Sequence, residues 1–471
     1  IGQGAKPGEG GQLPAPKVSV EIAALRGGTP KVELVSPPPH HDTYSIEDLG
    51  QLIHDAKAAR VRVIVKLVSS EGIGTIAVGV AKAGADVINV AGNTGGTGAA
   101  AVTSLKNTGR SPEIGIAEVH QALSVNGLRD KVILRCSAAH QNGTDVVKSA
   151  ILGGDSFEFG TTALMMLRCV MAKNCNIRCP AGLTTAHEEF KGDPRVLAQF
   201  FMNLAHEVRE ILAELGYSSL QELRGKTELL HLIDHPNMVG QIHLQKLLSE
   251  VEAIKIEKPV YLEKDFCFDD IFIDLIKSEL FGKRQKQLVI DGPEFKLNNR
   301  NKTVGGQAAI DLERYLAYEI SADDLAANSI IYTNQHGRRY LADDTITIRT
   351  HGSAGQSYAA FNNDGIRMEH TGTCNDGVGK TACGGTIVVK SPGGGSSRPG
   401  ENVLIGNFAL FGASGGRLFV NGEAGDRFAV RNSGAMAVVE GVGDFACEYM
   451  INGAVLNLGG FGKGFCTGMS G

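Results

Sequence analysis

Glycines recur at a nearly constant interval in the C-terminal part of the chain, and this repeat restricts the possible folds more than any other feature. The intervals are 19, 18 and 19 residues in the series Gly406, Gly425, Gly443 and Gly462. A second series with the same rhythm is formed by Gly422, Gly441 and Gly459. Apolar runs with high β-propensity lie between the glycines. This pattern predicts a stacked β-solenoid, with glycine at corners that require a positive φ.

The N-terminal third alternates between short β-branched runs and helical patterns. The expected strands are Val32–Ser36, Arg62–Val68, Asp86–Ala91, Lys131–Ser137 and Ser156–Phe159. One intervening helix, Ile46–Ala59, has Ser45 and Asp48 in the positions of a capping box. Such alternation predicts βαβ units and a parallel sheet, and an eight-stranded (β/α)8 TIM barrel is the expected closed form. Since only about five units are present and the chain opens on Ile1, we expect the other strands upstream.

Three regions follow from these patterns. We expect a partial barrel over residues 1–185, a helical connector over 186–260 and the glycine-rich β-helix over 261–471. In the connector, Arg195–Leu215 has the periodicity of one amphipathic helix that ends at Gly216. The expected fold class is therefore α/β followed by all-β.

The composition argues against two classes of partner. The chain has 471 residues, 42% hydrophobic and 21% charged, with a formal net charge of −5. We find no basic stripe with interleaved aromatic residues, and we expect no nucleic acid. The sequence contains no run of 18 apolar residues, and we expect no membrane span. The nine cysteines, an odd and mostly scattered set, favour a reducing compartment.

Two segments of the barrel region carry residues suited to anion binding. Gln3, Lys6 and Gln12 lie in a glycine- and proline-rich segment and could donate to a carboxylate or a flavin carbonyl. Arg26 could add a bidentate contact with a carboxylate. On composition alone, a segment of this kind is more often a solvated turn.

Lysine and glycine also occur where strands of the barrel are expected to end. Lys66 closes a buried strand, where it would face a ligand or extend its ammonium group to water. Gly95 and Gly96 follow the next strand, and consecutive glycines there could present amides to a phosphate.

Three cysteines are closely spaced after the last barrel strand. Cys169, Cys175 and Cys179 are followed by Pro180, which is typical of iron–sulfur ligation. Three ligands favour a 3Fe–4S cluster. A zinc site with a fourth ligand from elsewhere, or simply reduced thiols, would give the same spacing.

Taken in order, these motifs resemble the glutamate synthase family over nearly the whole chain. The segments that carry the resemblance are Gln3–Pro14, Ser36–Leu49, Lys66–Val68, Gly95–Gly98, Phe159–Thr161, Glu207–Gly216, Gly352–Ser357, Phe428–Gly434, Val439–Asp444 and Gly468–Gly471. The resemblance implies an FMN-binding barrel, a 3Fe–4S cluster and, at the C-terminus, a right-handed parallel β-helix of the GXGXG type. It also implies reductive amination of 2-oxoglutarate to glutamate with ammonia derived from glutamine.

The resemblance assigns roles to residues of this chain. Gln3, Lys6 and Arg26 would hold 2-oxoglutarate or its imine, and Lys6 and Lys66 would be catalytic. The FMN would be contacted by Gln12, Lys66, Gly95, Gly96, Gly160 and Thr161. The cluster would be ligated by Cys169, Cys175 and Cys179, and Lys66 would stabilise negative charge on the reduced flavin.

The family also implies partners. One is an N-terminal glutaminase domain upstream in the same chain. Electrons would come from NADPH, NADH or ferredoxin, through a reductase subunit or directly. The enzyme itself is expected to be soluble and oligomeric. The cytoplasm or an organelle (plastid or mitochondrion) is the expected compartment.

The sequence departs from the family pattern in three places. It has Asn93-Thr94 where the family has His-Asp, and one residue fewer between Cys175 and Cys179. The third departure is in the turn that holds the FMN phosphate. The family usually has Asp-Gly-Gly where this chain has Ser137-Ala138-Ala139. Alanine disfavours the positive φ that glycine allows. This departure motivates one alternative, a catalytically degenerate structural subunit. A second alternative is a related FMN enzyme that uses another amine.

Overall fold

A computed structural model describes residues 11–26, 29–36, 43, 45–93, 107–172, 175, 177–233, 245–256, 264–392 and 401–469. The chain divides into two compact units. The first unit comprises Ile1–Ile53 and Arg62–Glu263, and the second comprises His54–Val61 and Lys264–Gly471. Each unit is described by itself below.

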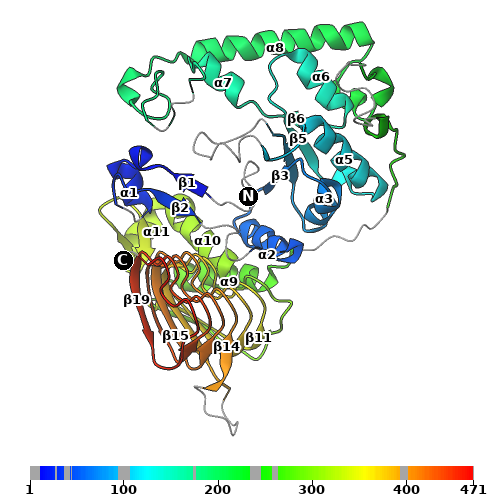
Figure 1. Cartoon of the computed structure of the whole chain (residues 1–471). Helices are drawn as coiled ribbons and strands as arrows, with labels where there is room; N and C mark the ends of the chain where they lie inside the picture. The colour runs from blue at the N-terminus through cyan, green and yellow to red at the C-terminus, as the bar shows by residue number, and fades with distance from the viewer. Residues whose placement is uncertain are drawn as a thin grey trace. The chain divides into compact units, whose positions relative to one another are not determined.

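The first unit is built on a parallel four-stranded sheet (Figure 1). Its strands, in sheet order, are β3 (Ile64–Val68), β4 (Val87–Ala91), β5 (Ile133–Ser137) and β6 (Ser156–Phe157). The helices that connect them are α3 (Ile73–Lys82), α5 (Pro112–Val125) and α6 (Gly143–Ile151). Four of the predicted strands are thus confirmed, and the sheet is compatible with part of a TIM barrel.

One face of this sheet is apolar because alternate residues of each strand point to the same side. Val65, Ile88 and Leu134 are at most 2% exposed. Glycines let the covering helices approach closely. A Cβ on Gly115 of α5 would lie 2.6 Å from Ser69 Oγ, and one on Gly74 of α3 would lie 2.9 Å from the Ala122 side chain.

The predicted strand Val32–Ser36 forms, but its expected place in the parallel sheet is wrong. β2 (Leu34–Ser36) pairs antiparallel with β1 (Gly11–Leu13), and the short helix α1 (Val20–Arg26) lies between these two strands in the sequence. A partner close in sequence costs less loop-closure entropy than a distant one. The alternation of strands and helices does not reveal this choice of partner.

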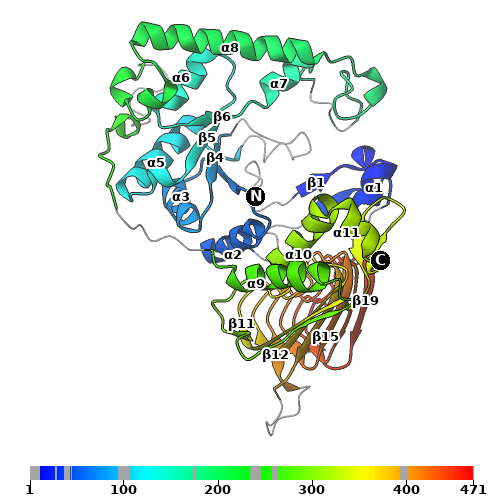
Figure 2. The same cartoon turned by 180° about the vertical axis from the view of Figure 1, so that it is seen from behind.

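Two helix predictions are confirmed at their ends. α2 (Ile46–Lys57) begins with a capping box, because the Ser45 and Asp48 amides each donate to the other residue's side chain, over 3.0 and 3.2 Å. α8 (Pro194–Leu215) ends at Gly216, whose φ is 78°. Figure 2 shows α8 running past α6, against which Leu204, Val208 and Leu212 pack. The other helical elements of this unit are α7 (Thr161–Met166) and 3-10 turns at Ala15–Lys17, Arg129–Lys131, His187–Glu189, Leu220–Leu223, Thr227–Leu229 and Gln245–Leu248.

The second unit begins with helices. α9 (Cys267–Leu275) continues as a π-helix, Ile276–Gly282, and α10 (Gly306–Arg314) continues as another, Tyr315–Glu319. α11 (Ala322–Ala327) follows.

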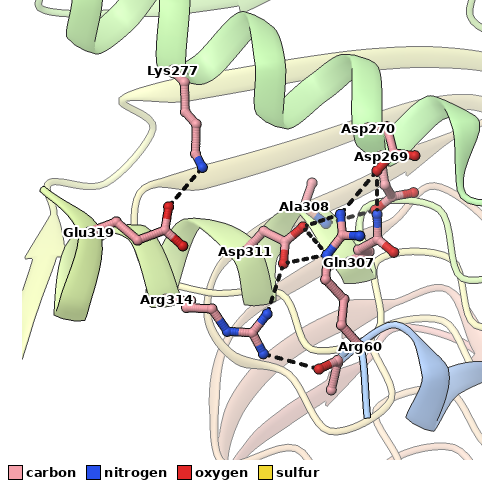
Figure 3. A network of polar contacts seen from close by, with 10 residues as sticks. Arg60, Asp269, Asp270, Lys277, Gln307, Ala308, Asp311, Arg314 and Glu319 are labelled. Atoms are coloured by element: carbon pink, nitrogen blue, oxygen red, sulfur yellow. Dashed lines mark hydrogen bonds and ion pairs between the residues drawn. The ribbon is translucent and has the colours of Figure 1, made fainter.

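A polar network fixes the segment His54–Val61 within this unit (Figure 3). Arg60 Nη2 lies 2.8 Å from Asp311 Oδ2 and 3.1 Å from Asp270 Oδ1, and Arg314 donates to the Ala59 carbonyl over 3.0 Å. These contacts join a short upstream segment to α9 and α10.

Parallel strands stack through the rest of the second unit (Figure 2). One ladder contains β11 (Ile346–Ala354), β12 (Ile366–Cys374), β13 (Cys383–Lys390), β15 (Gly415–Val420), β17 (Ser433–Val439) and β19 (Asn452–Asn457). A second run, which begins against β12, contains β14 (Val403–Ile405), β16 (Glu423–Ala424) and β18 (Gly441–Val442). β7 (Leu288–Ile290) and β8 (Lys296–Leu297) pair with β11, while β9 (Ile331–Thr333) and β10 (Arg339–Leu341) form a hairpin.

The repeat glycines have a different role from the one we predicted. Gly443 does not have a positive φ; instead, a Cβ added to it would lie 2.2 Å from Asp426 Oδ1. That oxygen accepts a hydrogen bond of 2.8 Å from the Asp444 amide. The same close approach, 2.3 to 2.5 Å, occurs at Gly406, Gly425 and Gly462. Glycine is required there because a carboxylate or amide of the preceding repeat occupies the space of a side chain.

Positive φ angles occur elsewhere in each repeat and mostly at residues other than glycine. Phe445, Cys447 and Tyr449 have φ values of 58°, 57° and 53°. Hydrogen bonds to neighbouring repeats hold these residues, for example from the Phe445 amide to the Lys463 carbonyl over 2.8 Å.

Among the helices that the structure describes in both units, none has the length and apolar character needed to cross a membrane.

Candidate active site

Four polar residues lie side by side across the parallel sheet of the first unit. Lys66 of β3 pairs with Asn89 of β4, Asn89 with Arg135 of β5, and Arg135 with Ser156 of β6. Residues in register on neighbouring parallel strands share one face of the sheet. This polar row therefore lies on the face opposite Val65, Ile88 and Leu134. Lys66, Asn89 and Arg135 are the middle residues of their strands.

Glu158 joins this row from the segment after β6. Asn89 Nδ2 donates to Glu158 Oε2 over 2.8 Å. Asn89 is only 4% exposed, and its Oδ1 has no hydrogen-bond partner within the described part of the chain. A buried acceptor without a donor calls for an explanation. A hydrogen-bond donor on a bound molecule would supply one.

The face carries opposite charges in close proximity. Burial alone would raise the pKa of Glu158, but hydrogen bonds from Asn89 and Ser137 and the charges of Lys66 and Arg135 outweigh it and lower that pKa. Glu158 is therefore ionised at neutral pH. Two cations facing one carboxylate leave the row with a net positive charge, which suits an anionic ligand.

The turn after β5 contains a residue with a positive φ, which we did not expect for alanine. Ala139 has a φ of 53°, so our expectation that alanine would exclude a positive φ here is wrong. A residue in this conformation can orient successive amides toward one anion. A cavity of about 230 Å³ adjoins the turn and is lined by Glu113, Ala138, Ala139, His140, Gln141, Asp145, Lys148 and Ser149. The charged residues of this lining are two carboxylates, Glu113 and Asp145, and one lysine, Lys148, so the backbone of the turn and not the charge of the cavity is the feature suited to an anion.

His140 fixes this turn against its surroundings. Its Nε2 lies 2.9 Å from Ser149 Oγ of α6, and its carbonyl accepts a hydrogen bond of 2.7 Å from Thr162 Oγ1 of α7. The ring is 1% exposed, and burial lowers the pKa of His140. A neutral, fully packed imidazole of this kind stabilises the turn.

The structure places the predicted residues Gly160 and Thr161 just beyond Glu158, at the start of α7. No atom outside the adjacent residues lies within 4 Å of a Cβ built on Gly160. Both residues thus lie after the carboxyl end of β6.

The three predicted cluster cysteines are all described, but they are not gathered into a metal site. Among the described residues, no group of three His, Cys, Asp or Glu side chains is placed to hold a metal ion. Threonines link two of the cysteine positions: Thr185 Oγ1 accepts from the Cys179 amide over 2.8 Å, and Thr184 Oγ1 donates to the Cys175 carbonyl over 2.9 Å.

Cys179 has the environment of a thiolate ligand. Burial would raise its pKa, but hydrogen bonds from the Thr184, Leu183 and Ala181 amides and the Thr184 hydroxyl outweigh this and lower the pKa of Cys179 to about 7. A thiolate is the form that binds metal. The donor chemistry at Cys179 therefore fits a cluster, while the arrangement of all three cysteines does not show one.

Several predicted residues cannot be compared with the structure. Gln3, Lys6, Gly95 and Gly96 lie outside the described residues. Gln12 lies in β1 and Arg26 ends α1, and for these two only the backbone is described.

Sequence reasoning missed Asn89, Arg135 and Ser156 of the polar row, and Glu158 beside it. A signal was present, because Asn89 interrupts the apolar strand Val87–Ala91 and Arg135 interrupts Ile133–Ser137. A buried polar group needs a partner, so such interruptions mark candidate ligand positions.

Comparison with known proteins identifies the family. A family model described as "Conserved region in glutamate synthase" matches residues 1–218, and one described as "GXGXG motif" matches residues 294–471. The "Glutamate synthase [NADPH] large chain" of Bacillus subtilis (strain 168) is 43% identical over the whole of this chain. The chain belongs to the glutamate synthase family.

Other glutamate synthases are similar to the same extent. The "Ferredoxin-dependent glutamate synthase" of Pyropia yezoensis is 42% identical and the "Glutamate synthase [NADH]" of Schizosaccharomyces pombe is 41% identical, each over 100% of this chain. The chain spans only 30% of the length of the Bacillus and Pyropia proteins and 22% of the length of the Schizosaccharomyces protein.

Proposed function

We propose that this chain is the synthase-site portion of a glutamate synthase that reductively aminates 2-oxoglutarate to glutamate with ammonia released from glutamine. The observation that carries the proposal is the polar row of Lys66, Asn89 and Arg135 with Glu158, on a parallel sheet in a chain of this family. The net positive charge of the row supports binding of an anionic cofactor and a dicarboxylate substrate.

FMN is the cofactor that these residues would hold. Lys66 would lie against the flavin ring, with contacts from Gln12, Gly95, Gly96, Gly160 and Thr161. The left-handed Ala139 turn supports phosphate binding. The unpaired Asn89 Oδ1 supports a ligand with a hydrogen-bond donor. When bound, FMN would supply the hydride, and a 3Fe–4S cluster would supply its electrons.

The substrate would be held by residues from the N-terminal segment. Arg26 and Gln3 would bind the carboxylates of 2-oxoglutarate, and Lys6 would donate a hydrogen bond to its carbonyl oxygen. That oxygen leaves as water when ammonia adds and the imine forms. The imine carbon then accepts a hydride and the nitrogen a proton, which gives glutamate. Lys66 would stabilise the negative charge on the reduced flavin.

Electrons would enter through the cysteine segment. Cys169, Cys175 and Cys179 would ligate the 3Fe–4S cluster, and the lowered pKa of Cys179 supports a thiolate ligand there. The relatives are named for NADPH, NADH or ferredoxin. One of these three would therefore be the electron source, directly or through a reductase subunit.

The stacked strands of the second unit would form a right-handed β-helix without a catalytic group. The parallel register between successive strands supports this architecture. It would be a structural part of an oligomeric enzyme that also contains an N-terminal glutaminase domain.

The test is glutamate formation by the full-length protein from glutamine and 2-oxoglutarate. NADPH, NADH and reduced ferredoxin are compared as donors, and methylamine is offered in place of glutamine in a parallel arm. Glutamate formed with one donor supports the proposal. Preferential consumption of methylamine would identify a related enzyme that uses another amine. A protein with neither activity nor bound flavin would be a structural subunit.

A further inference from the structure

The repeats of the second unit share a turn in which every second residue is left-handed. The middle residues of these turns form one column along the stack: Ala359, Gly379, Leu410, Ala429, Cys447 and Cys466, with φ values of 53°, 62°, 55°, 55°, 57° and 59°. Because the backbone is equivalent at each level, the side chains in the column point the same way. The column ends in two consecutive cysteines.

These two cysteines are direct neighbours in the stack. They are 19 positions apart in the sequence, which is one repeat. The Cys466 amide donates over 2.8 Å to the carbonyl of Ala446, the residue before Cys447, and the Tyr449 amide donates over 2.9 Å to Thr467. Backbones hydrogen-bonded in this way lie about 4.8 Å apart. Disulfides form at Cα separations of about 4.4 to 6.8 Å.

The thiols differ in exposure but contact each other. Cys447 is 2% exposed and belongs to the apolar core of the unit, whereas Cys466 is half-buried and packs against that core. Burial and a hydrogen bond with the Cys466 thiol raise the pKa of Cys447 to about 12. A small oxidant would therefore reach Cys466 first.

We propose that Cys447 and Cys466 are a site of reversible disulfide formation by exchange with a low-molecular-weight disulfide such as oxidised glutathione. The Cys466 thiolate attacks one sulfur of that disulfide, forms a mixed disulfide and releases one thiolate. Cys447 then attacks the Cys466 sulfur and displaces the second thiolate, which takes up the Cys447 proton. The two cysteines are oxidised by two electrons, and the small disulfide is reduced to two thiols.

The bond would fasten the last repeat to the one before it. β19 pairs with β17 on one side, and no other described strand pairs with it. A covalent link between Cys447 and Cys466 would limit separation of this repeat from the stack.

The test uses the full-length protein in glutathione redox buffers. Free thiols are alkylated and the peptides that contain Cys447 and Cys466 are analysed by mass spectrometry. The matched control is Cys383→Ser, which removes an exposed cysteine elsewhere in the same unit. Hydrogen exchange of Asn452–Asn457 is followed in the oxidised and reduced forms.

The expected result is a Cys447–Cys466 cross-linked peptide that dithiothreitol reverses. It forms in wild type and Cys383→Ser but not in Cys466→Ser, and amide exchange in Asn452–Asn457 slows at least severalfold on oxidation. Circular dichroism and exchange in β11 and β12 verify that Cys466→Ser is folded. A glutathione adduct on Cys466 without the cross-link, or thiols that stay reduced under oxidising buffer, would overturn the proposal.

Discussion

Asn89 Nδ2 and Glu158 Oε2 are joined by a hydrogen bond of 2.8 Å that links β4 to the segment after β6. This bond keeps the Glu158 carboxylate near Lys66 and Arg135, whose charges contribute to its lowered pKa. The charge of this face of the sheet is thus a balance of two cations and one anion.

Replacement of Glu158 by Gln should shift that balance. The amide can still accept from Asn89 while the negative charge is lost, so a dianionic substrate should bind more tightly. One charge near a partly exposed site changes binding by about 1 kcal/mol, or about fivefold. We expect a KM for 2-oxoglutarate about fivefold lower at low salt, with a smaller effect at high salt. Asp130→Asn, on the turn before β5, is the control; an equal effect in both variants, or none in Glu158→Gln, would contradict this account.

Ala139→Gly should stabilise the first unit. An L-residue other than glycine at a φ of 53° is strained, and glycine removes the strain at some cost in chain entropy. We expect a gain of about 1 kcal/mol in the free energy of unfolding, measured by urea titration with circular dichroism. Ala138→Gly is the matched control; it should be neutral or destabilising because Ala138 does not have a positive φ. A lower free energy of unfolding for Ala139→Gly than for wild type would show that Ala139 does not have a strained, positive φ.

Gly443→Ala should destabilise the second unit. Its Cβ would lie 2.2 Å from Asp426 Oδ1 and would displace the hydrogen bond to the Asp444 amide. Overpacking and loss of one hydrogen bond together cost about 2–3 kcal/mol. Gly460→Ala is the control, because a Cβ there meets no atom within 4 Å. Equal midpoints of urea unfolding for the two variants would contradict the role assigned to the repeat glycines.

Asp269 should make the second unit less stable as pH rises. Its carboxylate accepts from the Ala308 and Gly305 amides over 2.9 and 3.2 Å, but complete burial raises the pKa of Asp269 to about 7. A carboxyl group with a raised pKa in the folded state favours folding below its ordinary pKa, near 4. That contribution is lost as pH rises through about 7.

Hydrogen exchange of α10 measures this effect between pH 4 and 8, after correction for the intrinsic pH dependence of exchange. Wild type should lose protection with rising pH more than Asp269→Asn, whose neutral side chain does not titrate. Identical pH profiles for the two proteins would rule out ionisation of Asp269 as the cause.

The elements that were predictable from the sequence are those set by local patterns. The capping box at Ser45 and the end of α8 at Gly216 depend on neighbouring residues, and both are confirmed. The pairing of β2 with β1 depends on long-range competition between partners, which the pattern of Val32–Ser36 does not contain.

The candidate site was predictable only in part for the same reason. Lys66 was found because it interrupts an apolar run, although it lies in the middle of β3 and not at its end, as we had predicted. Asn89, Arg135 and Glu158 become a site only through the register of β3 to β6, which depends on how the strands pair. The glycine period was also visible, but its cause was not, because the oxygen that approaches Gly443 belongs to the preceding repeat.

The most direct test of the central claim is the amount of FMN bound per polypeptide in the full-length protein. It is compared for wild type, Lys66→Ala and the control Lys131→Ala, which alters the turn before β5. The account predicts stoichiometric FMN in wild type and Lys131→Ala, and at least a tenfold weaker affinity in Lys66→Ala. Absence of FMN from wild type, or equal affinity in Lys66→Ala, would contradict it.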